Sequence, residues 1–205
     1  MSAPLWLGAS DQYALASIAD CADALASALV AMSSSPDRPL DPPRMGLAAA
    51  NGQLLVMPST STGSIGAKLV TVADPAAATG GPRIQGVHVQ FDGTTLAPRA
   101  FLDGIALTNT RTAAVSVLAL RSLAAPESHD LLVFGAGPQA ASHIRGIKAE
   151  WPIERVRVVS RRPQSARNLV EDLLSDLAGI DVRALAPDEV DDAVSAADII
   201  VCATT

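Results

Sequence analysis

The sequence is poor in aromatic side chains, cysteine and positive charge, and each shortage excludes a class of protein. Aromatic residues make up only 3% of the 205 residues, although hydrophobic residues make up 49%. Alanine, valine and leucine must therefore build any core. The formal net charge is −6. This charge argues against a general nucleic-acid binder, which needs a basic surface to neutralise phosphates.

The two cysteines, Cys21 and Cys202, lie far apart in the sequence. Two such thiols fit a reducing compartment better than a disulfide framework, and no Cys/His cluster has zinc-ligand spacing. No apolar run reaches the roughly 18–20 residues that span a bilayer. The N-terminus lacks a basic segment followed by an apolar stretch, so a signal peptide is not expected. We therefore expect a soluble, cytoplasmic protein without a metal site.

The most informative stretch begins with an apolar segment of strand length at 131–134. Gly135, Gly137 and Ala140 follow in the spacing G-x-G-x-x-A and lead into a helix-forming stretch. This spacing is typical of a dinucleotide-binding turn, although an ordinary glycine-rich βα turn is the alternative. The first glycine permits the turn, the second lets a pyrophosphate approach, and the helix amides favour its negative charge. We expect five consecutive residues to bind the cofactor: Gly135, Ala136, Gly137, Pro138 and Gln139.

The second strand of this unit, at 155–159, ends in Ser160, Arg161 and Arg162. In dinucleotide-binding folds an acidic residue here binds the adenosine ribose of NAD, whereas a nearby arginine accommodates the 2′-phosphate of NADP. This chain has no carboxylate at the position, and guanidinium groups form charge-assisted contacts with phosphate. The sequence therefore favours NADP(H), with NAD(H) as the alternative. If it binds no phosphate, the arginine pair is simply a solvated part of a turn.

Strands and helices alternate from Asp130 onward in the order βαβαβαβ, which predicts an α/β Rossmann-type domain with a parallel sheet. The expected strands lie at 131–134, 155–159, 181–185 and 198–202, and the expected helices at 138–149, 163–178 and 187–196. A chain that stops after the fourth strand leaves the sheet half-built, so we expect a truncated product or a fragment. We place this domain at 126–205 and expect Ala203 and Thr204 to contact the cofactor.

Residues 1–125 are expected to form a small α+β domain built on antiparallel hairpins. One helix is predicted from Ser10 or Asp11 to about Met32, because apolar residues recur every three or four positions. Asn51-Gly52 and Asp92-Gly93 lie between apolar runs and predict two hairpins.

The rest of this first domain is predicted from shorter signals. Residues 58–66 are polar and contain glycine, which predicts a loop. Further strands are expected at 67–72, 86–91 and 96–102. A helix is expected from about Thr110 to Leu123, with Thr108 or Thr110 as its cap.

Arg44, Lys68 and Arg111 are isolated cations beside apolar or small-residue segments. Each alone is typical of a surface charge, but together they would suit an anionic substrate, because arginine binds carboxylates in a bidentate manner. Their spacing does not show whether they converge. His88 and His143 are candidate proton carriers, although a lone histidine is more often structural.

Several segments of the chain resemble the ornithine cyclodeaminase/mu-crystallin family, and the resemblance runs from about Arg44 to the end. The most specific are Val56-Met57-Pro58, Ala67–Val72, Leu107–Ala114 and Gly135–Ala140. The resemblance implies a homodimer in which the domain at 1–125 binds substrate and contributes to dimerisation. The Rossmann domain then holds a nicotinamide cofactor. It also implies that Arg44, Lys68 and Arg111 bind a substrate carboxylate, with Lys68 as the catalytic residue near the reacting centre.

Two departures point away from ornithine cyclodeamination. Family members with that activity carry a glutamate where this chain has Leu55, and an acidic residue where it has Ser160. The resemblance then implies NADPH-dependent reduction of a small cyclic imino acid, Δ1-pyrroline-2-carboxylate or Δ1-piperideine-2-carboxylate. The alternatives are an ornithine cyclodeaminase or amino-acid dehydrogenase of the same family, and a non-catalytic nucleotide-binding protein. The family's catalytic aspartate lies in a later part, and no residue up to Thr205 corresponds to it.

Overall fold

The computed structural model describes residues 3–34, 41–61, 63–75 and 82–204. Contacts divide the chain into two compact units, Met1–Ser17 with Ala31–Thr108 (unit 1) and Ile18–Val30 with Asn109–Thr205 (unit 2). The division falls inside two helices, α2 (Ile18–Ser33) and α3 (Gly104–Leu123). The expected division into domains 1–125 and 126–205 stays a prediction.

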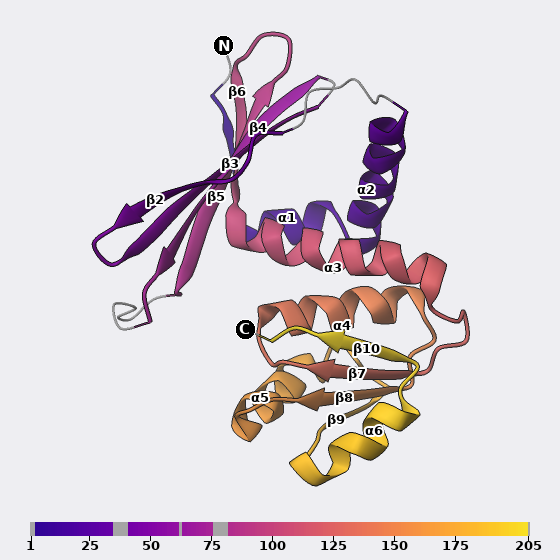
Figure 1. Cartoon of the computed structure of the whole chain (residues 1–205). Helices are drawn as coiled ribbons and strands as arrows, with labels where there is room; N and C mark the ends of the chain where they lie inside the picture. Colours follow the sequence, from indigo (N-terminus) through magenta and orange to yellow (C-terminus); the bar gives the residue numbers. More distant parts are fainter. Residues whose placement is uncertain (1–2, 35–40, 62, 76–81, 205) are drawn as a thin grey trace. The chain divides into compact units, whose positions relative to one another are not determined.

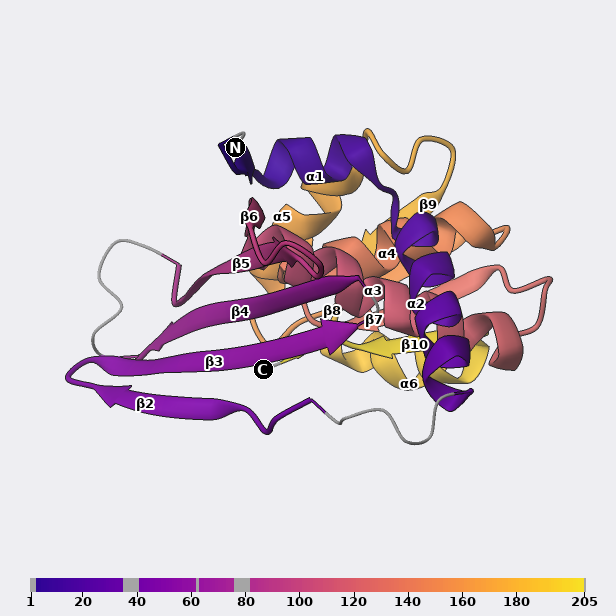
Figure 2. The same cartoon turned by 90° about the horizontal axis from the view of Figure 1, so that it is seen from above.

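Unit 1 is built on a six-stranded sheet in the order β1-β6-β5-β4-β3-β2 (Figure 1). Its strands are β1 (Leu5–Leu7), β2 (Met45–Ala49), β3 (Gly52–Ser61), β4 (Ser64–Ala73), β5 (Ile84–Asp92) and β6 (Pro98–Asp103). β1 runs parallel to β6, and all other neighbours are antiparallel. Figure 2 shows β2, β3 and β4 side by side. The antiparallel hairpins expected from the sequence are therefore present.

The hairpin predicted at Asn51-Gly52 forms, but its turn lies one residue earlier. Ala49 pairs with Gly52, which leaves Ala50 and Asn51 as the two turn residues. Gly52 has φ +148°, and a Cβ added to it would lie 2.2 Å from the carbonyl oxygen of Val72. Both its backbone conformation and the close approach of β4 therefore require glycine at this position.

The loop predicted at 58–66 is wrong, because β3 and β4 continue through it as a hairpin. Pro58 pairs with Ala67, and the ladder extends to Ser61 opposite Ser64. Proline usually interrupts a sheet because it has no N–H to donate. Here β2 pairs with β3 only as far as Val56, so the proline has a neighbouring strand on one side alone.

The single helix predicted from about Ser10 to Met32 is also wrong, since α1 (Ala9–Leu15) ends before α2 begins. Ala16 is extended, with φ −147° and ψ 130°. Ser17 and Asp20 then have the spacing of a capping signature, which favours a second helix start at Ile18. No single described helix is long and apolar enough to cross a membrane. The α1–α2 pair meets the criteria of length and composition only when the two helices are taken together across a break.

Helix α3 starts earlier than the predicted Thr110 and is not capped by either threonine. Its cap is Asp103, whose Oδ1 accepts the backbone N–H of Ile105 at 2.8 Å and of Ala106 at 2.9 Å. An aspartate in this position satisfies amides that have no partner inside the helix. The strand β6 therefore passes directly into α3.

Unit 2 has a four-stranded, wholly parallel sheet in the order β10-β7-β8-β9. Its strands are β7 (Asp130–Phe134), β8 (Arg155–Val159), β9 (Asp181–Ala184) and β10 (Ile199–Cys202). Its helices are α4 (Pro138–Glu150), α5 (Pro163–Leu173), the 3-10 helix η1 (Pro187–Glu189) and α6 (Val190–Ala196). This order confirms the predicted Rossmann-type α/β architecture, in which the first strand lies between the second and the fourth.

Aliphatic side chains fill the core of unit 2. Val133 of β7, Val156 of β8 and Ile144 of α4 are completely buried. Ala114 and Val117 of α3 belong to the same cluster, which explains why most of α3 is counted in this unit. His143 is also buried here, with Nδ1 2.7 Å from the carbonyl oxygen of Gln139 and Nε2 3.0 Å from Ser116 Oγ.

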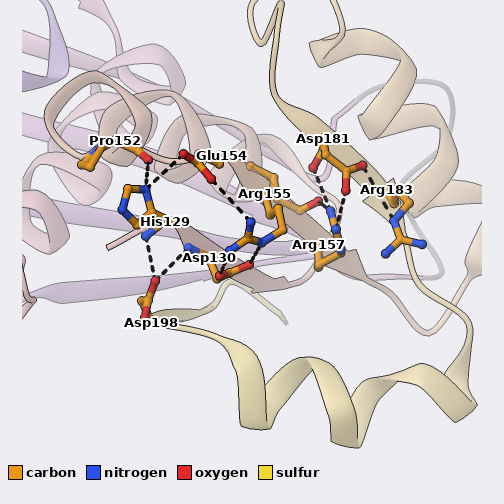
Figure 3. A network of polar contacts seen from close by, with 10 residues as sticks. His129, Asp130, Pro152, Glu154, Arg155, Arg157, Asp181, Arg183 and Asp198 are labelled. Atoms are coloured by element: carbon orange, nitrogen blue, oxygen red, sulfur yellow. Dashed lines mark hydrogen bonds and ion pairs between the residues drawn. The ribbon is translucent and has the colours of Figure 1, made fainter. Parts of the chain in front are cut away.

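One face of the sheet in unit 2 carries paired charged residues beside the buried Leu132. Arg155 donates from Nε and Nη2 to the carboxylate of Asp130 on the neighbouring strand. Arg157 donates from Nη2 to Asp181 Oδ2 at 2.5 Å (Figure 3). A hollow of about 300 Å³ runs along these arginines and beside α6. Parallel sheets are usually covered on both faces, and α6 lies beside this face.

Asp198 holds the neighbouring strands β7 and β10 together at their amino-terminal ends (Figure 3). Its Oδ2 accepts the backbone N–H of His129 at 2.7 Å and of Asp130 at 3.0 Å. These backbone hydrogen bonds lower the pKa of Asp198 below its ordinary value, because they favour the charged carboxylate. The carboxylate thereby fixes the start of β10 against the start of β7.

Candidate functional site

The glycine turn after β7 lies at the carboxyl ends of the parallel strands. Gly135 has φ +120°, and a Cβ added to it would lie 2.3 Å from the carbonyl oxygen of Ala203. The N–H of Gly135 donates to the carbonyl oxygen of Val159 at 2.8 Å. The N–H of Ala203 donates to the carbonyl oxygen of Phe134 at 2.7 Å. The turn is therefore clamped between the ends of β8 and β10, and it requires glycine for two separate reasons.

Gly137 differs from Gly135 because it faces open space. A Cβ added to it would meet nothing within 4 Å, and its φ of −105° is open to any residue. It is the N-cap of α4, with Pro138 in the first turn and no side-chain hydrogen bond to the cap. The first-turn N–H groups of a helix have no intrahelical partner and favour a negative charge. The missing side chain therefore leaves room for an anionic group against these amides, which fits a pyrophosphate.

A groove of about 400 Å³ begins at this turn and continues between α4 and α5. Ala136, Gly137 and Pro138 line it on one side, and Ser165 and Asn168 of α5 on the other. Ala140, the third small residue of the motif, is completely buried. It lets α4 pack close to the sheet, as the motif predicts.

Gln139 is the one predicted cofactor residue whose side chain turns toward α3. Its Nε2 donates to Asn109 Oδ1 at 2.7 Å. Its Oε1 is buried and has no hydrogen-bond partner among the described residues. The amide therefore fixes the start of α4 to α3, a role that the motif alone does not indicate.

The end of β8 presents a hydroxyl and two guanidinium groups. Ser160 is half-buried, and its Oγ accepts the N–H of Arg162 at 3.4 Å. Arg161 and Arg162 are exposed, and neither forms an ion pair within the described part of the chain. Both cations are thus available to an anionic ligand at the carboxyl end of the strand. Ala203 is half-buried beside Gly135, and Thr204 is exposed.

Lys68 is half-buried in the middle of β4 in unit 1. Its Nζ donates to Thr108 Oγ1 at 3.2 Å. The register pairs it with Met57 on one side and with His88 on the other. Arg44 is exposed and directly precedes Met45, the first residue of β2, which pairs with Val56. Met57, the residue after Val56, is the partner of Lys68 on β4.

Arg111 is exposed on α3, three residues after Thr108, and is counted in unit 2. The convergence of the three predicted cations therefore stays a prediction. The two candidate histidines have different environments. Both ring nitrogens of His143 have hydrogen-bond partners inside unit 2, as expected of a structural histidine. His88 lies beside Lys68 on the sheet, with Nε2 3.2 Å from Gln90 Oε1.

Sequence reasoning did not single out Thr108 or Asn109 for their contacts with Lys68 and Gln139. Both lie in the segment Leu107–Ala114 that carries the family resemblance. Their place in this segment is the one feature of the sequence that could have pointed to them. Among the described residues, no group of three or more His, Cys, Asp and Glu side chains is placed to hold a metal ion.

Residues 6–205 match the model of the ornithine cyclodeaminase/mu-crystallin family. The chain belongs to this family. It is 44% identical over 140 residues to the Δ1-pyrroline-2-carboxylate reductase of Paracoccus denitrificans, an alignment that covers 68% of the chain and 43% of that relative. It is 32% identical over 161 residues to the ketimine reductase mu-crystallin of Macropus fuliginosus, covering 77% of the chain and 49% of the relative. The chain thus spans less than half the length of these two relatives.

The fold agrees with a solved structure of Thermococcus litoralis Δ1-pyrroline-2-carboxylate reductase in complex with NADH and L-proline. The TM-score is 0.85 at 26% identity, over 98% of this chain and 62% of that one. The family resemblance drawn from the sequence is therefore confirmed, and so is the Rossmann-type fold that it implied.

Proposed function

We propose that the protein is an NAD(P)H-dependent reductase of small cyclic imino acids, Δ1-pyrroline-2-carboxylate or Δ1-piperideine-2-carboxylate. The 44% identity to a Δ1-pyrroline-2-carboxylate reductase carries the proposal. The open space at Gly137 supports it, because this is the cradle that a nicotinamide dinucleotide needs for its pyrophosphate. Leu55 supports reduction over ornithine cyclodeamination, because it supplies no carboxylate where the cyclodeaminases of the family carry a glutamate.

Gly135–Gln139 and the residues after β8 would hold the cofactor. When bound, the reduced nicotinamide supplies the hydride that adds to the imine carbon. Arg44, Lys68 and Arg111 bind the neighbouring carboxylate and hold the imine in one orientation, which is a proximity effect. Lys68 donates a hydrogen bond or the proton that the imine nitrogen takes up. The product is the corresponding cyclic amino acid.

The preferred cofactor is NADP(H), bound through Ser160, Arg161 and Arg162. The exposed guanidinium groups and the absence of an acidic residue at the end of β8 support this choice. Replacing either arginine by alanine should weaken NADPH binding at least tenfold and leave NADH binding nearly unchanged. Arg167→Ala is the matched control, because Arg167 is an exposed cation on α5 that bonds Gln164. Equal losses for both cofactors would contradict the 2′-phosphate assignment.

The activity itself is tested by mixing the protein with NADPH or NADH and Δ1-piperideine-2-carboxylate, and following the nicotinamide absorbance. Consumption of NADPH with formation of the cyclic amino acid supports the proposal. Ammonia release from ornithine without net cofactor change would instead indicate a cyclodeaminase. Cofactor binding with neither reaction would indicate a non-catalytic nucleotide-binding protein.

We further propose that the protein forms a homodimer through the sheet of unit 1. Cross-strand partners share a face of a sheet, and the register puts one set of apolar residues on the face opposite Lys68. That set comprises Trp6, Leu47, Leu54, Val56, Leu69, Val87, Val89 and Phe101. None of them is buried, and Trp6 is 64% exposed. A contiguous apolar face of this kind is typical of a surface that another chain covers.

Light scattering after size-exclusion chromatography tests the dimer. The protein should elute with twice the mass of one chain, and Leu69→Lys should shift it toward the mass of one chain. Gln53→Lys, an exposed position on the other face of β3, should leave the mass unchanged. A protein that elutes with the mass of one chain at micromolar concentration would contradict the proposal.

A further inference from the structure

Lys68 lies on the face of β4 that helix α3 approaches. Side chains alternate between the faces of a strand, so Lys68 shares its face with Gly66 and Val70, which are both buried. The neighbouring Leu69 lies on the opposite, apolar face. The side chain of Lys68 therefore leaves β4 on the face of the sheet that α3 approaches.

Gly104 lets the start of α3 lie directly on the sheet. A Cβ added to Gly104 would lie 2.7 Å from the carbonyl carbon of Gly86 on β5. Real Cβ atoms do not come so close to backbone atoms, so a larger residue would push the helix away from the sheet. Asp103 fixes the residue at which the helix starts, since it caps the first amides.

This close packing brings Thr108, one turn into α3, onto Lys68. The hydroxyl of Thr108 donates to the carbonyl oxygen of Gly104 at 2.5 Å, and its oxygen accepts from Lys68 Nζ at 3.2 Å. Because the hydroxyl hydrogen is directed into the helix, the oxygen presents its lone pairs to the lysine. The threonine thus acts as an oriented acceptor for a long and flexible cation.

We infer that Thr108 is a positioning residue that holds the amino group of Lys68 for reaction with the imino acid. The inference rests on the proposed function, in which Lys68 contacts the substrate. Thr108 acts through the lysine and contacts neither hydride nor cofactor. The pair links β4 to α3 across 40 residues of sequence.

Thr108→Val keeps the shape of the side chain and removes the oxygen, whereas Thr108→Ser keeps the oxygen. We expect Thr108→Val to lower kcat with NADPH and Δ1-piperideine-2-carboxylate at least tenfold, without a change in the Kd of NADPH. Thr108→Ser should recover most of the rate. In a Lys68→Met background Thr108→Val should add no further loss, because groups that act through one contact are not additive.

A loss that is equally large in the Lys68→Met background would overturn the inference, since the threonine would then act on the fold alone. An unchanged kcat in Thr108→Val would also overturn it. Circular dichroism confirms that each variant is folded. A second readout needs no activity: acetylation of Lys68 by acetic anhydride, followed by mass spectrometry, should be several-fold faster in Thr108→Val. Unchanged acetylation refutes the contact, whereas faster acetylation in a protein without reductase activity refutes only the proposed function.

Discussion

Separate alanine substitutions of Gly135 and Gly137 should distinguish folding from cofactor binding. Gly135→Ala puts a side chain on a residue with φ +120°, where a non-glycine residue costs about 1–3 kcal/mol. Its Cβ would also lie 2.3 Å from the carbonyl oxygen of Ala203. Overpacking of this kind adds about 1–3 kcal/mol. The β10–β7 pairing resists the movement that would relieve the contact, so we expect a total loss of about 4 kcal/mol.

Gly137→Ala should leave the folded state stable but weaken cofactor binding. With φ at −105° and nothing within 4 Å of the added Cβ, the folded state accepts alanine. Replacing glycine in a compatible conformation stabilises a protein by about 0.4–1 kcal/mol through the unfolded state. The added methyl group occupies the space proposed for the pyrophosphate, so the Kd of NADPH should rise at least tenfold.

Urea unfolding followed by tryptophan fluorescence measures the first effect. Trp151 is 8% exposed and belongs to the core of unit 2, and the other tryptophan is Trp6. A Trp6→Phe background therefore makes the signal specific to unit 2. With an m-value of about 2 kcal/mol per M, a loss of 4 kcal/mol lowers the urea midpoint by about 2 M.

Titration of NADPH, followed by its fluorescence, measures the second effect. The reasoning is refuted if Gly135→Ala keeps the midpoint of the parent protein. It is equally refuted if Gly137→Ala binds NADPH as tightly as the parent.

The polar contacts of unit 2 provide two more tests. Because Asp198 has a lowered pKa in the folded protein, its stabilisation is complete above the unfolded pKa of about 3.9 and is lost as the pH falls through the folded value. Asp198→Asn should therefore lower the urea midpoint at neutral pH, with the difference shrinking in acid; a constant difference would contradict this. Arg121→Ala removes the bidentate contact with Glu150 and a contact with Asp23. We expect it to cost about 1 kcal/mol in urea unfolding, as for other exposed pairs, and a midpoint equal to that of Arg167→Ala would refute a stabilising role.

The architecture of unit 2 could be predicted because each of its elements carries a local signal. The apolar run before Gly135 and the small residue at Ala140 follow from the geometry of a βα turn, and they do not depend on distant residues. The parallel sheet with right-handed crossovers then follows from the alternation of strands and helices. The glycine turn was accordingly located from the sequence, whereas its role in holding a cofactor stays a prediction.

Unit 1 was harder to predict because its elements depend on neighbours that are distant in the sequence. Pro58 and the polar residues after it are typical of a loop, and they form strand only because β4 supplies hydrogen-bond partners. Asp103 is an unremarkable residue in sequence, and only the structure identifies it as the cap of α3. The contact of Lys68 with Thr108 depends on Gly104, whose role is the absence of a side chain. No pattern in the neighbouring sequence indicates that a helix approaches a sheet this closely.

The clamp on the cofactor turn has a consequence for synthesis on the ribosome. Asp198 follows Asp130 by 68 residues, and at about 5–20 residues per second this separation takes roughly 3–14 s to translate. During that interval β7 and β8 can pair, but the carbonyl that closes over Gly135 does not yet exist. The turn at Gly135 is thus without its clamp until β10 has been made, long after β7 itself. Vectorial synthesis therefore delays completion of the proposed cofactor turn until after β7 and β8 are available to pair.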